Sequence, residues 1–347
     1  MCTDINKYRA MVSVYSIAHF LVDFACAFLM FSSIAGTSDG YLCVLLYNFC
    51  AFAMQMPLGI IADKFNRNFI FAVKGCILVG MAYLLTAFPV AAVIFLGIGN
   101  AMFHIGGGID ILNISEKKLS ALGVFVSPGA FGIYFGTILG KGNEISYFII
   151  PLLLIVAAVL ILAVYRFQLK KGNYLENKTF SLDGICSEHI IAAIACLFFV
   201  VCLRSFVGMS LNFSWKSIRI WGTVLTCAVV FGKTLGGFIA DRFGVMKTTM
   251  FSLGIASLLF LLPQIPVAGV AAVLLFNMTM PITLWAVAKI LPNAKGFAFG
   301  LLTFGLFIGF LPTYLGFTAS AELFWIFPLI AAISLFVLWV GLRRAKQ

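Results

Sequence analysis

The chain has 347 residues, of which 63% are hydrophobic and only 10% charged, and its mean hydropathy is +1.10. This composition excludes a water-soluble globular fold and indicates an integral membrane protein. The net charge of +11 does not imply nucleic-acid binding, because most basic residues flank apolar runs, where anionic lipid headgroups can solvate them.

The apolar runs have the length of membrane helices, about 20 residues, rather than that of the short alternating strands of a barrel. Joints such as GTSDG, PQIP and LPNAKG contain helix breakers. The first run is too long for a signal-peptide core, so we expect it to remain as a span. Twelve spans are predicted, at residues 8–34, 41–62, 69–88, 90–111, 119–140, 145–166, 189–213, 217–240, 248–263, 267–290, 296–316 and 320–342.

One long polar stretch, RFQLKKGNYLENKTFSLDG, interrupts the spans near the middle of the chain. It predicts a cytoplasmic linker, residues 169–187, between an N-terminal six-helix bundle, residues 1–168, and a C-terminal six-helix bundle, residues 188–347. The expected fold is an all-α integral membrane protein with twelve transmembrane helices in two pseudo-symmetric bundles. Most of the 23 basic residues lie on the cytoplasmic side if both termini are cytoplasmic. We therefore expect a multi-pass protein of the plasma or inner cell membrane in that orientation.

The first span contains AHFLVDF, which places His19 and Asp23 one helical turn apart near mid-membrane. An unpaired charge at that depth costs at least a few kcal/mol, so ionisable groups there usually face an interior cavity. Asp23 is the one acid predicted deep in the membrane. We expect it to carry a proton, with His19 and with His104 of span four tuning or relaying that proton. The alternative is a polar clamp between spans one and four that carries no proton.

The two halves of the chain repeat each other. GIIADKFNRN at residues 59–68 returns as GFIADRFGVM at residues 237–246, and SALGV at residues 120–124 matches GFAFGL at residues 296–301. Two halves of equal length and the same orientation indicate a duplication about an axis normal to the membrane. This arrangement predicts alternating access to a cavity between the halves.

The repeated loop is a candidate gate. Asp63 and Asp241 lie at cytoplasmic helix ends, where each can pair with a basic residue or with the N-terminus of a neighbouring helix. Such contacts would form while the cytoplasmic side is closed and break when it opens. The alternative is a solvated loop whose charges only set the topology. The predicted gating residues are Gly59, Asp63, Lys64, Arg67, Gly237, Asp241 and Arg242.

Both copies of G-x-x-x-D-[RK]-F resemble the signature loop of the major facilitator superfamily. Within that superfamily, AHFLVD, GIGNAMFHIGGG, LRSF and MPITLWAVAKILPNAKGFAFGL resemble the fosmidomycin-resistance type of efflux transporters. The resemblance implies a secondary transporter that works by alternating access in the efflux direction. The sequence departs from the family pattern at Asn66, where a glycine is usual, and at FHI, where FHP is usual.

Spans seven and eight add positive charge to the interior. Arg204 and Lys233 are two fixed cations against one deep acid, which favours an anionic substrate such as a carboxylate, phosphonate or phosphate ester. Two alternatives stay open: Arg204 extends to the membrane surface, and Lys233 neutralises Asp23 across the cavity. The predicted substrate-binding residues are Arg204, Lys233, Gln55, Asn100 and Asn277.

The remaining signals exclude several functions. The nine cysteines form no CxxC pair, and no His or Cys cluster has metal-ligand spacing, so we expect no metal and no cofactor. The sequence has no nucleophile elbow, so we expect no enzyme activity. We predict a secondary active transporter that moves a small organic anion by proton-coupled alternating access, in the efflux direction, as a monomer whose partners are substrate, protons and lipids. The alternatives are a nutrient importer or uniporter of the same fold, or a transport-inactive membrane receptor or assembly protein.

Overall fold

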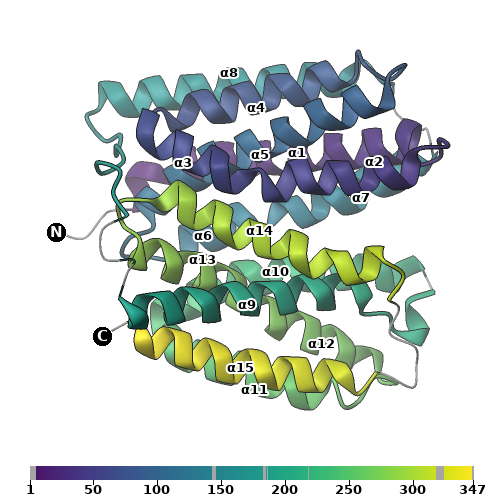
Figure 1. The fold of residues 1–347 in the computed structure, drawn as a ribbon, viewed down its shortest axis with the longest axis vertical. Helices are drawn as coiled ribbons and strands as arrows, with labels where there is room; N and C mark the ends of the chain where they lie inside the picture. Colours follow the sequence, from purple (N-terminus) through teal and green to yellow (C-terminus); the bar gives the residue numbers. More distant parts are fainter. Residues whose placement is uncertain are drawn as a thin grey trace.

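A computed structural model describes residues 5–142, 146–182, 185, 187–217, 219–317 and 324–345. These residues form helices and no strand, and most of the helices run side by side along one direction (Figure 1). Ten helical segments are long and apolar enough to cross a membrane, and two shorter apolar helices lie where spans three and nine were predicted. The all-α membrane class is therefore confirmed. The start of the twelfth predicted span, residues 320–323, lies outside the described residues, and the count of twelve stays a prediction.

The described helices fall into two groups, in the upper and lower parts of Figure 1. The first group is η1 Ile5–Tyr8, α1 Arg9–Leu29, η2 Met30–Ile34, α2 Gly40–Asn48, η3 Phe49–Ala53, α3 Gln55–Phe65, α4 Asn68–Ala82, α5 Pro89–Ile114, α6 Ser120–Val126, α7 Pro128–Gly142 and α8 Ile149–Lys170. The second group is α9 Glu188–Ser210, η4 Ser214–Ser217, α10 Arg219–Phe243, α11 Val245–Leu259, α12 Pro266–Asn277, α13 Thr279–Ile290, α14 Lys295–Tyr314 and α15 Ile326–Arg344.

Three predicted spans are divided rather than continuous. The π-helical η3 separates α2 from α3, the step from Ser127 to Pro128 separates α6 from α7, and Met278 separates α12 from α13. Proline lacks the N–H that would continue the helical hydrogen bonds, which explains the second break. Irregular backbone at membrane depth is tolerated where it lines a cavity. Residues beside all three breaks line a cavity between the helices.

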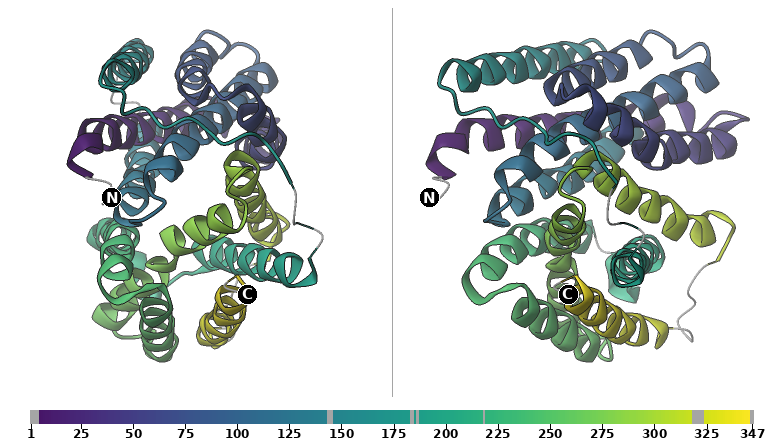
Figure 2. Two further views of the ribbon diagram at one scale, coloured as in Figure 1. Left: turned by 90° about the vertical axis from the view of Figure 1, so that its left-hand side faces the viewer. Right: turned by 60° about the vertical axis from the view of Figure 1, so that its left-hand side comes forward.

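Both chain termini lie at the same end of the molecule, at the left of Figure 1, and we call this the terminal end. Figure 2 shows the segment that follows α8, residues 171–182, running across the helices of the first group at this end. The two groups meet along two seams, α3 against α14 and α10 against α6 and α7.

The turn after α3 explains why asparagine can stand at position 66, where the signature loop usually has glycine. This residue has φ 50° and ψ 41°, the left-handed conformation, which asparagine tolerates better than most other residues. Its side-chain oxygen accepts a hydrogen bond of 2.8 Å from the backbone N–H of Asn177. The side chains of Asn177 and Asn68 exchange two further hydrogen bonds, of 2.9 and 3.0 Å. Asparagine therefore replaces glycine while also attaching the segment after α8 to the first group.

Glycines bring the two groups into backbone contact at the terminal end. A Cβ atom added to Gly59 would lie 2.1 Å from the carbonyl oxygen of Gly296, and one added to Gly300 would lie 2.3 Å from that of Gln55. On the second seam, a Cβ atom on Gly237 would lie 2.8 Å from the nearest backbone atom of the first group. The glycines that repeat in the sequence thus occupy the two seams.

We expect Gly59→Ala to push α3 and α14 apart, because its methyl group would meet rigid backbone rather than a flexible side chain. Overpacking of this kind costs about 1–3 kcal/mol. Thermal unfolding in detergent, followed by tryptophan fluorescence, should show a lower midpoint than the wild type. Gly80→Ala is the matched control, since its new Cβ would meet nothing closer than 3.9 Å. Equal midpoints for the two variants would contradict the close approach of α3 to α14.

Candidate functional site

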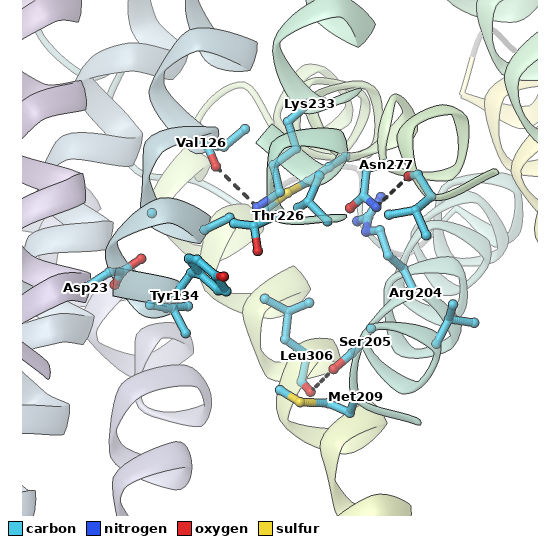
Figure 3. A pocket seen from close by; sticks show the side chains of 18 of the residues that line it. Asp23, Val126, Tyr134, Arg204, Ser205, Met209, Thr226, Lys233, Asn277 and Leu306 are labelled. Carbon is cyan, nitrogen blue, oxygen red and sulfur yellow. Dashed lines mark hydrogen bonds between the residues drawn. The ribbon is translucent and has the colours of Figure 1, made fainter. Parts of the chain in front are cut away.

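A cavity of about 650 Å³ lies between the two groups of helices. Figure 3 shows Asp23 on one side of it, Arg204 on the other, and Lys233 above the space between them. The cavity extends to residues that follow α9 at the end opposite the terminal end, including Phe213 and Lys216. Its volume is in the range of small-molecule binding sites.

His19, Asp23 and His104 meet in the wall that α1 and α5 form. The Nε2 atom of His19 lies 3.2 Å from Asp23 Oδ2 and 2.9 Å from the Nε2 atom of His104, which is itself 3.7 Å from Asp23 Oδ1. Asn100 donates a 2.9 Å hydrogen bond to Asp23 Oδ1. Gly129 of α7 covers the cluster so closely that a Cβ there would lie 2.3 Å from Asp23 Oδ2. The structure thus brings together the three residues that the sequence predicted for proton coupling.

The hydrogen bonds of this cluster fix the positions of its ring protons. The Nδ1 atoms of His19 and His104 lie 2.7 and 2.9 Å from the carbonyl oxygens of Phe125 and Asn100. A carbonyl oxygen only accepts, so both Nδ1 atoms carry a hydrogen. One of the two Nε2 atoms must also carry a hydrogen, because their 2.9 Å contact needs a donor. This geometry can therefore accommodate one extra proton on the histidine pair, with the carboxylate of Asp23 beside it.

The same three side chains could hold a metal ion. Their ligand atoms lie within 4.8 Å of one another, the one such group of His, Cys, Asp and Glu in the described part of the chain. Two imidazoles and a carboxylate are a common ligand set for zinc. The hydrogen bond between the two rings accounts for the geometry with a proton alone, and the absence of a metal stays a prediction.

Arg204 lies on the opposite wall of the cavity without a counter-ion. Its side chain is buried, with the residue 8% exposed, and it donates hydrogen bonds of 3.4 and 3.0 Å to the hydroxyls of Thr279 and Thr283. Among the described residues, no carboxylate lies within ion-pair distance of it. The alternative that Arg204 extends to the membrane surface is therefore wrong, because the guanidinium turns inward to α13. A buried charge of this kind is costly until an anion accompanies it.

Lys233 lies at the seam between α10 and α6. Its ammonium group donates a 3.4 Å hydrogen bond to the carbonyl oxygen of Val126, as Figure 3 shows. No ion pair joins Lys233 to Asp23 in the described residues, so the two do not pair directly. The alternative that Lys233 neutralises Asp23 across the cavity stays a prediction. Lys233 therefore adds a second cation to the cavity.

The predicted substrate-binding amides divide between the cavity and the cluster. Gln55 and Asn277 line the cavity, and the Oε1 atom of Gln55 has no hydrogen-bond partner. Asn100 is not among the residues that line the cavity, and its side chain donates to Asp23 instead. Its predicted contact with substrate is therefore replaced by a contact with the acid. Sequence reasoning missed Thr279 and Thr283, although their i, i+4 spacing places both hydroxyls on one helix face.

Both aspartates of the repeated loop bind helix N-termini across the seams. Asp63 accepts hydrogen bonds of 2.8 and 2.9 Å from two backbone N–H groups at the start of α14. Asp241 accepts bonds of 2.7 and 3.0 Å from two N–H groups at the start of α6. Carboxylates are stabilised at helix N-termini by the helix dipole and by unpaired N–H groups. The sequence offered a basic residue or a helix N-terminus as the partner, and each aspartate binds the helix N-terminus. We call these two contacts the Asp63 latch and the Asp241 latch.

The basic residues of the loop lie elsewhere. The ammonium of Lys64 is 5.5 Å from the ring centre of Phe180, Arg242 lies over the neighbouring Phe243, and Arg67 is exposed. A further contact that the sequence did not reveal crosses the α14 seam. Lys295 forms a 2.9 Å ion pair with Glu116, and its hydrogen bond lowers the pKa of the Glu116 carboxyl below its ordinary value.

We expect each latch to protect its own helix N-terminus from hydrogen exchange. In Asp63→Asn, amides of a peptide covering residues 294–298 should exchange about tenfold faster or more, since hydrogen bonds to charged groups contribute about 1.5–3 kcal/mol. A peptide covering residues 117–122 should be unchanged. Asp241→Asn should give the reverse pattern and serves as the matched control. Equal exchange of both peptides in both variants would contradict the latches.

Comparison with known proteins places the fold. No family model matches the sequence, and no curated protein matches it. The structure is similar to a crystal structure of the major facilitator superfamily (MFS) transporter FucP in the outward conformation, with TM-score 0.68, 14% identity, and coverage of 98% of this chain and 100% of the other. A crystal structure of a variant of the Escherichia coli fucose:proton symporter FucP is similar with a TM-score of 0.67 and 14% identity, and it covers the same shares of the two chains.

A third similar structure is a bacterial homologue of the iron transporter ferroportin in the outward-facing state. Its TM-score is 0.66 at 12% identity, over 97% of this chain and 100% of the other. Identities this low show the fold alone. The chain is thus a membrane protein with the fold of the MFS transporters. The narrower resemblance to fosmidomycin-resistance transporters stays a prediction.

Proposed function

We propose that the protein is a secondary active transporter that moves a small organic anion through the central cavity by proton-coupled alternating access. The observation that carries this proposal is Arg204, a buried cation that faces the cavity without a carboxylate partner among the described residues. A bound carboxylate, phosphonate or phosphate ester would supply its counter-ion, with Lys233 as a second cation. We further propose a monomer with twelve spans in two pseudo-symmetric bundles, in the plasma or inner membrane.

The proton is proposed to bind the cluster of His19, Asp23 and His104. This cluster lies in the wall of the same cavity as Arg204, so the charge of one site acts on the ligand of the other through a medium of low dielectric constant. Gain or loss of the shared proton changes the cavity by one unit of charge. Coupling between proton and anion then needs no direct contact between them.

The proposed gate consists of the two latches and the glycine seams at the terminal end. If both termini are cytoplasmic, as the basic residues indicate, the state described here has a closed cytoplasmic side and a cavity that extends outward. The outward conformations of the similar structures support this assignment. Opening of the cytoplasmic side would break both latches together with the contact between Lys295 and Glu116.

The direction of transport has two candidates. Resemblance of the sequence supports efflux by exchange with protons. The signs of the charges support a second candidate, anion:proton symport into the cell, because a proton on the cluster and an anion at Arg204 attract each other and favour joint binding. Both candidates share the same site and the same coupling ion.

The test uses purified protein in liposomes with a pH-sensitive dye inside. Small organic anions, cations and zwitterions are added in turn outside, with protein-free liposomes as the control. We expect lumenal pH to change with one class of anion only. Lumenal acidification on anion entry indicates symport, and alkalinisation indicates exchange. Movement of a labelled anion without a pH change would contradict proton coupling. If neither anion movement nor a pH change is detected, a receptor or assembly protein is favoured.

A further inference from the structure

Most polar side chains in the cavity wall already bond to the protein backbone. The Ser205 hydroxyl donates to the carbonyl oxygen of Leu306 at 2.6 Å, a bond drawn in Figure 3. Four others donate to a backbone carbonyl three or four residues earlier in the chain: Gln55 to Ala51, Thr226 to Gly222, Asn277 to Val273 and Thr303 to Gly300. A hydroxyl that is engaged in this way has no second hydrogen to donate, and each amide keeps only one N–H for a ligand. The cavity therefore offers few neutral hydrogen-bond donors.

The rest of the wall is mainly apolar and aromatic. Phe52, Phe276, Phe299, Phe310, Met209 and Leu306 are among its lining residues. Figure 3 shows Met209 and Leu306 on the far side of the cavity from Lys233. Arg204 and Lys233 are thus accompanied by a region of the wall that presents hydrocarbon, and a third cation, Lys216, lies where the cavity reaches the end opposite the terminal end. This lining favours a ligand that is charged at one end and apolar along its body.

We propose that the substrate is an amphipathic anion, with one anionic head group bound by Arg204 and an aromatic or aliphatic body against the apolar wall. This inference rests on the proposed function, since it assumes that an anion occupies the cavity. Burial of each added methylene should raise affinity about threefold to fourfold. A hydroxyl directed at the apolar part of the wall should lower it about tenfold, because the phenylalanine, leucine and methionine side chains there cannot accept or donate a normal hydrogen bond. We therefore expect sugars and polyhydroxy acids to bind weakly.

The experiment compares carboxylates of graded polarity. Binding of butyrate, hexanoate, octanoate and gluconate is measured by titration calorimetry on protein in lipid nanodiscs, with empty nanodiscs as the control for partition into lipid. We expect affinity to rise about tenfold from butyrate to hexanoate and again to octanoate. Gluconate, which has the six carbons of hexanoate with five hydroxyls, should bind at least about 100-fold more weakly.

Two variants place the apolar contact in the cavity. Met209→Gln replaces a residue of the cavity wall by one of similar size. It should lower the affinity for octanoate several-fold and leave the affinity for gluconate unchanged. Met250→Gln is the matched control, because both methionines are 51% exposed but Met250 does not line the cavity. Equal binding of gluconate and hexanoate, or an equal effect of the two variants, would overturn the amphipathic substrate. If no carboxylate of either kind binds or is transported, the proposed function itself fails.

Discussion

Asp23→Asn is expected to abolish substrate-driven proton movement while leaving exchange of the anion itself measurable. In the proposed mechanism the carboxylate is the counter-ion of a proton that His19 and His104 share, and asparagine cannot supply that charge. The variant keeps the shape of the side chain, so the neighbouring helices should pack as before. Without the counter-ion the second imidazole proton is lost, and one ring nitrogen then faces the other without a hydrogen between them. We expect substrate-driven proton flux to fall at least about 100-fold.

The measurement is lumenal pH in the liposome assay, run beside exchange of a labelled anion. His189→Gln is the control, because His189 is the third histidine of the chain and lies exposed near the start of α9, outside the cavity lining. It should leave both signals unchanged. Wild-type proton flux in Asp23→Asn would mean that the cluster is the polar clamp considered from the sequence. Loss of both signals in a folded variant would assign Asp23 to binding rather than to coupling.

Arg204→Met is expected to weaken anion binding and to stabilise the ligand-free protein. Binding loses the cation that balances the substrate, by a factor of at least about 100, or about 2.7 kcal/mol. Stability rises because an uncompensated buried charge is replaced by an apolar side chain of similar length. These opposite signs separate a substrate-binding arginine from one that only supports the fold, since a structural arginine would lower stability on removal.

The two effects are measured on the same preparation, by calorimetric titration with hexanoate and by thermal unfolding without ligand. Arg204→Lys is the informative companion, because it keeps the charge but lacks the planar fork that can bind a carboxylate through two hydrogen bonds. It should retain part of the affinity. Unchanged hexanoate binding in Arg204→Met, or a lower unfolding midpoint without ligand, would contradict the role of Arg204 as the anion site.

Hydropathy and local spacing predicted most of the helices and one half of the site. The i, i+4 spacing of His19 and Asp23 needs only a helix to place both on one face, and mid-membrane depth marks them as unusual. The repeated glycines and aspartates were visible because the duplication preserves them. Each of these signals is local or periodic, so it survives without knowledge of how distant helices pack.

The sequence could not predict contacts that depend on packing between helices. Asp63 had two possible partners, and only the arrangement of α3 against α14 selects the helix N-terminus. Asn100 was placed at the correct depth, but its face was not determined, and it points at Asp23 instead of the cavity. The helix breaks were missed because hydropathy is continuous through Met278 and through the π-helical turn that ends at Ala53. Inward orientation of Arg204 likewise depends on two threonines from another helix.

The two latches are equivalent in the sequence repeat but differ in their exposure to water. Asp63 is 4% exposed, whereas Asp241 is an exposed residue. Dissolved ions weaken attraction between charges that water reaches and act much less on buried ones. Rising ionic strength should therefore loosen the α10 seam while the α14 seam stays closed. The terminal end would then open in a fixed order: α6 separates from α10 first, and α3 separates from α14 second.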